Sequence, residues 1–378
     1  MTLENQRIKL AILSAGLGHI HRGFEVAASR LFSGLHDDPV IEARLFCGGI
    51  FPDSCQCANF PRDGKVATAL RRLTLIHDGC RLEQISFGVG VIGHLIVWRP
   101  DVVWIQEYSL GRILKKLRKL LGLRFQILFC DGAPAGPTAS GQFDYVQHLH
   151  PASFDEAIRY GLPRDRMFVM PHWITKFQGP SQKSVRELQQ QLGIDEDDFV
   201  VVSVAAWNRH HKRIDYLIKE VGAIQSDRVK LVLCGQEESD TPMLKALGQK
   251  HLPGRIHWIT LPAQEVAALL ELADAFVLAS LNEGLGAALI ESAVMGTPTI
   301  AHNHSAAHFI LEDKGVILDL AQPLNLKLAL EKILASPWSA EECDCLRDSA
   351  RARFFDSALL PLFRKQIHAI ATRQPLVA

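Results

Sequence analysis

The chain has 378 residues, enough for two domains of ordinary size that each bury a core of their own. Hydrophobic residues make up 48% of the chain, charged residues make up 22%, and the formal net charge is zero. This composition is that of a globular protein without the basic excess that nucleic-acid binding requires, so any anion site must be built locally.

The N-terminus, "MTLENQRIKLAILSAG", has neither the apolar region nor the cleavage site of a signal peptide. The longest apolar run, 85–98, carries three glycines and a histidine and is too short to cross a bilayer. The eight cysteines lack the spacing of a zinc ribbon, and several lie in apolar runs, which indicates buried thiols in a reducing compartment. We expect a soluble, cytoplasmic protein.

Strand-like apolar runs alternate with amphipathic helical stretches along the first half. A buried-strand pattern at 8–16 precedes a helix over 25–35. Further strand-like runs lie at 41–49, 101–107, 125–131, 143–149 and 166–174. Continuous apolar strands separated by helices are typical of a parallel sheet covered on both faces. Residues 1–175 are therefore predicted to form a Rossmann-like, doubly wound α/β domain, which binds ligands at the carboxyl ends of its strands.

The pattern then repeats after a polar stretch, 175–184, which is the predicted linker. The second series of strand-like runs lies at 198–208, 229–236, 255–261, 274–280 and 297–303. We predict a second Rossmann-like domain over 185–340, with a cleft between the two domains. Residues 341–378 read as amphipathic helix and are expected to pack back across the domains.

The stretch "NEGLGAALIESAVMGTPTIAHN" (282–303) contains two glutamates: Glu283 lies in the loop that enters a predicted helix over 286–296, and Glu291 lies within that helix. Helix N-termini favour anionic ligands, and Gly284 and Gly286 let the backbone approach a ligand closely. Glu291 is expected two helical turns beyond Glu283, at an angle of about 80° from it. Both carboxylates could then reach the hydroxyls of one bound molecule; an ordinary helix cap followed by a solvated glutamate is the alternative.

This stretch resembles the E-x7-E signature of retaining glycosyltransferases of the family 4 type (glycosyl transferases group 1), which have the GT-B fold. The matching positions are Ser280, Glu283, Gly284, Leu285, Gly286, Glu291, Gly296, Thr297 and Pro298. The resemblance covers almost the whole chain and implies a hexosyltransferase that uses a nucleotide-diphosphate sugar. It also implies that Glu291 holds the ribose, that Glu283 contacts the donor sugar, and that the backbone of 284–286 lines the sugar and phosphate.

The tract "VAAWNRHHKRIDYLI" (204–218) occupies the place where relatives carry Gly-Arg, a short loop and Lys-Gly. Lys212 aligns with the family lysine, but the family arginine falls on Trp207, so Arg209 is the best substitute. These cations are expected to stabilise the leaving diphosphate, which removes the need for a metal ion. A solvated basic turn is the alternative.

In the first domain, "SAGLGHIHRGFE" (14–25) is a glycine loop between a strand and a helix. It lacks the third glycine of a dinucleotide fingerprint, so NAD binding is disfavoured. The resemblance implies that Gly16 and Gly18 line the donor phosphates, with His19 or His21 on the acceptor side. A purely structural turn is the alternative.

Two carboxylates, Glu107 and Asp131, follow strands at the same predicted sheet edge. Glu107 is an acceptor-side candidate, and Asp131 is a catalytic candidate that could orient the acceptor hydroxyl. The family is thought to use the donor phosphate itself as the proton acceptor, so no dedicated base is required. For Asp131, a capping or turn role is the alternative.

Residues 111–125, "GRILKKLRKLLGLRF", form a cationic amphipathic stretch. Two interpretations remain open. The stretch could rest on the anionic inner face of a membrane, as a lipid-linked acceptor would require, or it could be a covering helix with a solvated basic face.

The sequence therefore predicts a retaining glycosyltransferase that needs no cofactor beyond its nucleotide-sugar donor. A GT-B-fold sugar-nucleotide epimerase or a non-catalytic nucleotide-sugar-binding protein is the alternative. His304 and His308 have a helical ligand spacing, but no carboxylate or cysteine is grouped with them, so no metal is expected. The sequence specifies neither the donor base and sugar nor the acceptor, the linkage or the oligomeric state.

Overall fold

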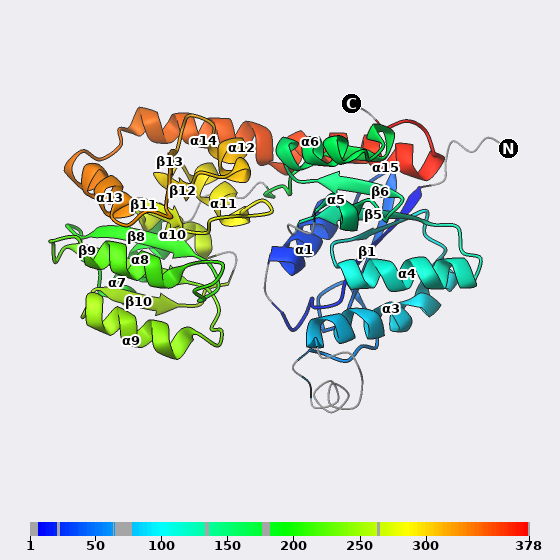
Figure 1. The fold of residues 1–378 in the computed structure, drawn as a ribbon, viewed down its shortest axis with the longest axis horizontal. Coiled ribbons are helices and arrows are strands. Elements are labelled where there is room, and N and C mark those ends of the chain that lie inside the picture. The colour runs from blue at the N-terminus through cyan, green and yellow to red at the C-terminus, as the bar shows by residue number, and fades with distance from the viewer. Residues whose placement is uncertain are drawn as a thin grey trace. The chain divides into compact units, whose positions relative to one another are not determined.

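The computed structural model describes residues 7–20, 23–62, 64, 78–132, 136–175, 182–262 and 265–376. The chain divides into two compact units, shown in Figure 1: unit 1 comprises residues 1–175 and 356–378, and unit 2 comprises residues 176–355. Most of the predicted linker, namely 176–181, lies outside the described residues.

The sheet of unit 1 has seven parallel strands in the order β3-β2-β1-β4-β5-β6-β7. The strands are β1 (Ile8–Ser14), β2 (Ile41–Cys47), β3 (Cys55–Gln56), β4 (Val102–Ile105), β5 (Gln126–Asp131), β6 (Tyr145–His148) and β7 (Met167–Val169). The chain winds outward from β1 to β3 and then returns to the other side of β1 with β4. The point between β1 and β4 is therefore a topological switch point, where such sheets bind ligands.

The sheet of unit 2 repeats this plan with six parallel strands in the order β10-β9-β8-β11-β12-β13. The strands are β8 (Phe199–Val204), β9 (Val229–Cys234), β10 (Ile256–Ile259), β11 (Ala275–Leu278), β12 (Thr299–His302) and β13 (Val316–Leu318). Its switch point lies between β8 and β11. The prediction of two Rossmann-like, doubly wound domains is confirmed.

Helices connect the strands and cover the sheets (Figure 1). Those of unit 1 are α1 (Gly23–Leu35), α3 (Gly79–Trp98), α4 (Tyr108–Leu120), α5 (Pro137–Ser140), α6 (Pro151–Tyr160) and α15 (Asp356–Thr372). Those of unit 2 are α7 (Gln182–Leu192), α8 (Ile214–Gly222), α9 (Thr241–His251), α10 (Val266–Leu272), α11 (Ala287–Met295), α12 (Ser305–Leu311), α13 (Asn325–Ala335) and α14 (Ala340–Phe354).

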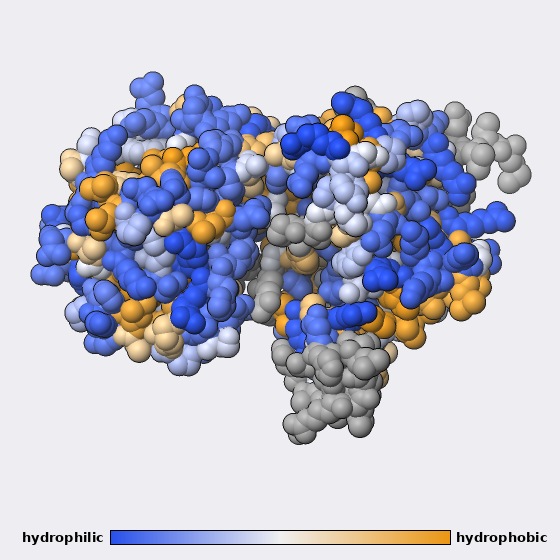
Figure 2. Space-filling model, viewed as in Figure 1, coloured by the Kyte–Doolittle hydropathy of each residue, from blue (hydrophilic) through white to orange (hydrophobic). Residues whose placement is uncertain are grey.

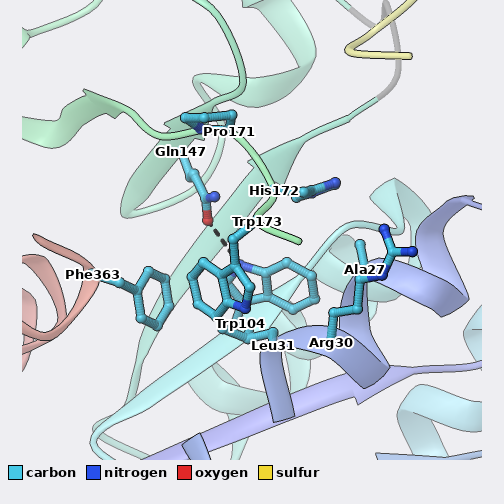
Figure 3. A pocket seen from close by; sticks show the side chains of 9 residues that line it. All are labelled: Ala27, Arg30, Leu31, Trp104, Gln147, Pro171, His172, Trp173 and Phe363. Carbon is cyan, nitrogen blue, oxygen red and sulfur yellow. Dashed lines mark hydrogen bonds between the residues drawn. The ribbon is translucent and has the colours of Figure 1, made fainter. Parts of the chain in front are cut away.

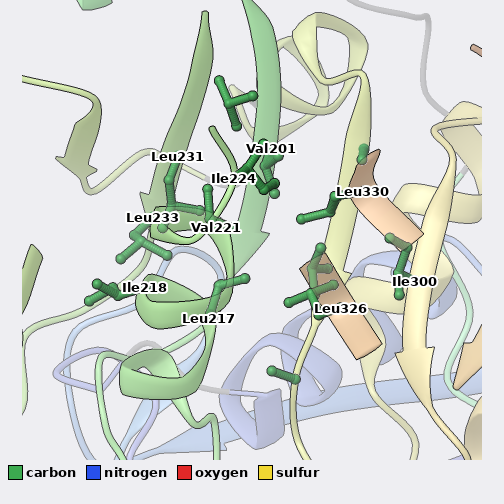
Figure 4. Packing of buried hydrophobic residues seen from close by; sticks show 14 of the residues in the cluster. Val201, Leu217, Ile218, Val221, Ile224, Leu231, Leu233, Ile300, Leu326 and Leu330 are labelled. Carbon is green, nitrogen blue, oxygen red and sulfur yellow. The ribbon is translucent and has the colours of Figure 1, made fainter. Parts of the chain in front are cut away.

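Buried aliphatic side chains hold the sheet of unit 2 to its helices. Figure 4 shows members of this cluster from several elements: Leu217 and Val221 of α8, Leu231 of β9, Ile300 of β12 and Leu326 of α13. Burying each such side chain stabilises the fold by about 1.5–3 kcal/mol relative to leaving it in water. The continuous apolar runs of the sequence are thus explained, because both faces of each strand are covered.

Helix α3 is longer than its apolar run indicated. It spans 20 residues, begins after the capping carboxylate of Asp78, and is long and apolar enough to cross a membrane by length and composition alone. In the structure, however, Phe87, Val91 and Leu95 pack into the core beneath the sheet. This packing is that of the covering helix of an α/β unit.

The residues predicted as one C-terminal segment, 341–378, are divided between the units. Helix α14 belongs to unit 2 and begins at a capping box in which Ser339 and Glu342 bind each other's backbone. Helix α15 belongs to unit 1, where the Phe363 ring packs edge-on against Trp173 at 5.5 Å and Arg364 pairs with the buried Asp38.

Candidate active site

The best-formed polar cluster of unit 2 lies at its switch point. The loop that follows β8 carries Lys212, and the loop that follows β11 carries Glu283. Because β8 and β11 are neighbours in the sheet, these loops emerge side by side at its carboxyl edge. Two residues that are 71 positions apart in sequence are thereby brought into contact.

Lys212 and Glu283 form a close ion pair, with 2.5 Å between Nζ and Oε1. The Glu283 residue is 9% exposed, and the Lys212 side chain is 19% exposed. Burial by itself would raise the pKa of the Glu283 carboxyl, but the charge and hydrogen bond of Lys212 outweigh burial and leave that pKa below its ordinary value. Glu283 is therefore ionised at neutral pH, and removing either partner would leave a largely buried charge behind.

Helix α11 begins at Ala287, one residue after the predicted start at Gly286. Gly286 adopts a left-handed conformation with φ of 82° and caps the helix, so that Ala287 is its first residue. Glu291 consequently lies one turn into the helix rather than two, and Glu283 lies in the preceding loop. The predicted angle between the two glutamates does not apply, because it assumed that both belong to one helix.

Glu291 is half-buried. Its charge is one of the causes, after burial, that raise the pKa of the Cys234 thiol to about 11, and Cys234 is the last residue of β9. The carboxylate thus lies near the same sheet edge as the Lys212–Glu283 pair. Leu285, between the glutamates, is buried at 4% exposure and anchors the loop.

The loop that carries Lys212 is organised by Asn208, a residue that the sequence did not single out. Its side-chain oxygen accepts hydrogen bonds from the backbone N–H groups of His211 (3.0 Å) and Lys212 (2.8 Å). Its side-chain amide donates to Glu238. Asparagine is suited to such a turn because its short side chain can replace a backbone acceptor.

The two residues considered for the family arginine lie away from the ion pair. Trp207 is buried and packs edge-on against Trp258 at 5.0 Å, so this position is part of the core. Arg209 lies beside Asp240, with 3.8 Å between Nε and Oδ2, and its backbone N–H donates to the same carboxylate. The structure therefore brings Lys212, but not Arg209, into contact with Glu283.

A different side chain of this loop does approach Glu283. The Nε2 atom of His211 lies 3.6 Å from Oε1 of Glu283 and 3.1 Å from the carbonyl oxygen of Asn282. Within the described parts of the chain, no three His, Cys, Asp or Glu side chains gather as metal ligands would. His304 instead caps α12, and His308 hydrogen-bonds Asn303.

In unit 1, the predicted glycine loop lies at the other switch point, directly after β1. Gly18 has φ of 96°, and a Cβ there would come within 2.6 Å of the backbone at Gly49 and Ile50. At Gly16, a Cβ would meet the carboxylate of Glu25 at 2.3 Å. Both glycines therefore have a packing reason to be glycine. His21, the second acceptor-side histidine, lies outside the described residues.

His19 is held by a buried carboxylate beneath the loop. Its Nε2 atom lies 2.7 Å from Oε1 of Glu83, which is fully buried in α3 and also pairs with Arg62 at 2.7 Å. Through Glu83, the glycine loop is linked to Arg62 and to helix α3. The role of His19 toward an acceptor stays a prediction.

Glu107, which was predicted on the acceptor side, is buried within unit 1. It is 4% exposed, and its Oε1 atom accepts a hydrogen bond from the backbone N–H of Ala15 at 2.8 Å, across the β1–β4 switch point. Burial is the main cause that raises its pKa to about 8, although the Ala15 hydrogen bond opposes the shift. The residue thus ties the glycine loop to the end of β4.

Asp131 ends β5, and His148, which the sequence did not single out, occupies the paired position at the end of β6. The closest carboxylate and imidazole atoms are 3.7 Å apart, and both side chains are largely buried. Burial, reinforced by the charge of Glu156, raises the pKa of Asp131 to about 7, and burial lowers that of His148 to about 4. Near neutral pH, the imidazole is uncharged and the carboxyl is poised between its two forms. The feature that relates His148 to Asp131 is the register of β5 with β6, which pairs these two residues.

A pocket in unit 1 lies apart from these groups (Figure 3). It is lined by Ala27, Arg30, Leu31, Trp104, Gln147, Pro171, His172, Trp173 and Phe363. Its walls are mainly indole, phenyl and aliphatic surface. Burial lowers the pKa of His172 to about 3, so that its ring is neutral. The Gln147 side chain accepts a hydrogen bond from the Trp104 indole and donates one to the Met170 carbonyl oxygen. Arg30 is the one cationic side chain among the described residues of the lining, and the remainder of the pocket offers little that would bind a diphosphate.

Unit 2 is similar to known sugar transferases. Residues 184–353 match the family model described as glycosyl transferases group 1. The alpha-monoglucosyldiacylglycerol synthase of Streptococcus pneumoniae is 28% identical over 150 residues, 37% of this chain and 33% of that protein. The MMP alpha-(1->4)-mannosyltransferase of Mycolicibacterium hassiacum is 27% identical over 158 residues, 40% of this chain and 38% of that protein. The matches thus span little more than a third of these relatives' length.

Solved structures are similar over almost the whole chain. HepE of Anabaena, solved with UDP and glucose, has a TM-score of 0.76 at 15% identity, covering 96% of this chain and 100% of HepE. Sucrose-phosphate synthase of Thermosynechococcus elongatus has a TM-score of 0.77 at 18% identity, with 96% and 100% covered. At such identities, the likeness concerns the fold.

Proposed function

Since the chain has the GT-B fold and its second unit belongs to the glycosyl transferases group 1 family, we propose that the protein is a retaining glycosyltransferase using a nucleotide-diphosphate sugar. The observation that carries this proposal is the buried Lys212–Glu283 pair at the switch point of unit 2. A lysine beside an ionised carboxylate supplies one charge for the departing diphosphate and one for the sugar.

Each charge has a separate task in such a transfer. As the bond between the sugar and the diphosphate breaks, negative charge grows on the phosphate and positive charge grows at the anomeric carbon. Lys212 would stabilise the phosphate, and Glu283 would face the sugar. Glu291, one turn into α11, would accept hydrogen bonds from the ribose hydroxyls, while the backbone of 284–286 would lie along the sugar and phosphate.

The donor is proposed to be a UDP-sugar in the first instance, because HepE, which shares the fold, has been solved with UDP-glucose. The acceptor is a glycan, a lipid-linked sugar or a small molecule. On the acceptor side, Asp131 would orient the attacking hydroxyl. No metal ion enters this scheme.

We expect a nucleoside diphosphate to raise the melting temperature, because it binds the folded protein and not the unfolded chain. At a concentration of about 100 times its dissociation constant, the ligand would add about 2.7 kcal/mol to the free energy of unfolding. The measurement is thermal unfolding with UDP, GDP and ADP at millimolar concentration, with Lys212→Met as the matched control. Three unmoved melting curves would reject the donor site.

Turnover separates the proposed enzyme from its alternatives. Incubation with a panel of nucleotide sugars should release the nucleoside diphosphate, with or without an added acceptor. Binding without release would favour a nucleotide-sugar-binding protein, and interconversion of the sugar without release would favour an epimerase.

We also propose that residues 111–125 contact a membrane, together with the end of α3. Both α3 and α4 cross back over the sheet beside β4 and pack against one another, so their carboxyl ends lie at the same edge. Large apolar side chains are exposed there: Val97 is 85% exposed and Leu120 is 79% exposed, with Ile96 and Leu121 also exposed. Figure 2 shows this apolar surface bordered by hydrophilic residues.

The charges around this surface specify its partner. The exposed basic side chains of the two helix ends and of α4 are Arg99, Arg112, Lys115, Lys116, Lys119 and Arg124. Exposed leucine and valine side chains bordered by cations fit a bilayer that contains anionic lipid. The diacylglycerol in the name of the Streptococcus pneumoniae relative is compatible with a lipid acceptor.

Reversing Lys115, Lys116 and Lys119 to glutamate is expected to weaken binding to anionic vesicles by roughly 100-fold or more, since each cation near the surface contributes about 1 kcal/mol. The measurement is co-sedimentation with vesicles of phosphatidylglycerol and phosphatidylcholine. The control reverses Lys219, Lys250 and Lys332, which are exposed on unit 2 and give the same change in net charge. Equal sedimentation of the wild type and the α4 variant would leave α4 as an ordinary covering helix.

A further inference from the structure

We propose that His211 is the second donor to the diphosphate, in the place that the sequence assigned to Arg209. This inference rests on the proposed function, because it concerns the same donor site. A diphosphate carries more than one negative charge, whereas the positive charge of Lys212 is already shared with Glu283. A second donor near this pair would therefore strengthen binding and stabilise the leaving group.

The arginines of the loop are directed elsewhere. Arg209 pairs with Asp240 through its side chain and its backbone N–H. Arg213 has a left-handed backbone, and its guanidinium donates to the carbonyl oxygen of Leu320 at 2.7 Å and stacks on the ring of Tyr216 at 4.2 Å. Among the ionisable side chains of 209–213, all of which the structure describes, only those of Lys212 and His211 form a close contact with the Glu283 carboxylate, at 2.5 Å and 3.6 Å.

The position of His211 is built into the fold of the loop. The Asn208 side chain holds the backbone N–H groups of both His211 and Lys212, so the two side chains leave the loop at adjacent, defined points. The His211 ring donates toward the Asn282 carbonyl oxygen at 3.1 Å and remains 54% exposed. An exposed ring beside an enclosed lysine is accessible to a ligand that approaches the pair from solvent.

Several charged groups surround this ring. Glu283 and Lys212 face it directly, while Asp240 and Arg209 lie on the α9 side of the loop and Glu238 is bound to Asn208. An N–H of the ring can donate to a phosphate oxygen, and a hydrogen bond to a charged acceptor is stronger than one between neutral groups.

The test compares UDP binding by calorimetry in three single variants. His211→Gln is expected to weaken UDP binding by about 10-fold, the effect of losing one hydrogen bond to a charged group. Arg209→Gln, the matched control in the same loop, should change it by less than 2-fold, roughly the scale of an exposed ion pair. His211→Arg, which keeps N–H donors at this position, should restore wild-type affinity.

The outcomes separate this inference from the proposed function. Equal UDP affinity of the wild type and His211→Gln, or a large loss in Arg209→Gln alone, would overturn the role of His211 and leave the glycosyltransferase proposal standing. Wild-type protein that binds no UDP, GDP or ADP would overturn both. Circular dichroism and the melting temperature without nucleotide establish that each variant is folded, and His211, which is exposed, is not needed for the core.

Discussion

Replacing Glu283 by glutamine is expected to lower kcat with little change in KM for the donor. The structure shows a carboxylate kept ionised by Lys212 despite its burial, which is the form that stabilises positive charge at an anomeric carbon. Because that charge develops only as the bond breaks, the interaction is stronger in the transition state than with the bound donor. A loss of about 2–4 kcal/mol in transition-state stabilisation, roughly 30- to 900-fold in kcat, is typical of such a group.

Glu291→Gln is the matched comparison, since it makes the same chemical change one turn into α11. A ribose contact is present in both the ground state and the transition state, so this variant should mainly raise KM. The measurement is steady-state kinetics on both variants, with folding checked by circular dichroism. Full kcat in folded Glu283→Gln would end the catalytic assignment of this glutamate.

Glu283→Gln also affects the stability of the protein, which must be measured together with its kinetics. Glu283→Gln removes the partner of Lys212, whose ammonium is largely enclosed. Leaving a buried charge unpaired is costly. The melting temperature of Glu283→Gln must therefore be measured beside its kcat. A reduced kcat in a variant that is still folded at the assay temperature is a loss of catalysis and not of structure.

Raising the pH from 6 to 8 is expected to destabilise the wild-type protein by about 2 kcal/mol more than it destabilises Glu107→Gln, since one pKa unit corresponds to about 1.4 kcal/mol. The pKa of Glu107 rises from 4.5 to about 8 on folding, mainly because of burial. The folded state therefore binds this proton more tightly than the unfolded state does. The resulting stabilisation is complete below about pH 4.5, declines as pH rises, and is exhausted above about pH 8.

Urea unfolding followed by tryptophan fluorescence at several pH values measures this difference. Glutamine keeps the oxygen that accepts the Ala15 N–H and cannot ionise. Asp131, whose pKa is raised to about 7, and the buried histidines titrate in both proteins, so their contributions cancel. Parallel stability curves for the wild type and Glu107→Gln would contradict the raised pKa.

The sequence predicted both sheets because each strand is buried on both faces and reads as an unbroken apolar run. All five runs predicted as strands in unit 2 are strands in the structure, β8 to β12. It did not reveal the edge strands β3 and β13, which have only two and three residues, although it did indicate β7, an edge strand of three residues, from the longer apolar run around it.

The candidate site was only partly predictable for a related reason. The glycines and glutamates of 282–291 lie within one local motif, whereas the partners of the loop residues come from distant parts of the chain. Arg209 is held by Asp240, which is 31 positions away. Glu107 accepts a hydrogen bond from Ala15, which is 92 positions away. No local pattern encodes such contacts. His148 was missed because its relation to Asp131 is set by strand register alone.

Helix α15 imposes an order on how the protein is completed during synthesis. Unit 1 contains the first 175 residues and also residues 356–378, and its core includes Phe363 packed on Trp173. All of unit 2 is made between these two segments. Unit 1 thus starts to be made before unit 2 and is completed only after unit 2 has its full sequence. A premature stop just before residue 356 would spare the family-matched unit and leave the N-terminal one with an uncovered apolar surface, a target for chaperones and proteases.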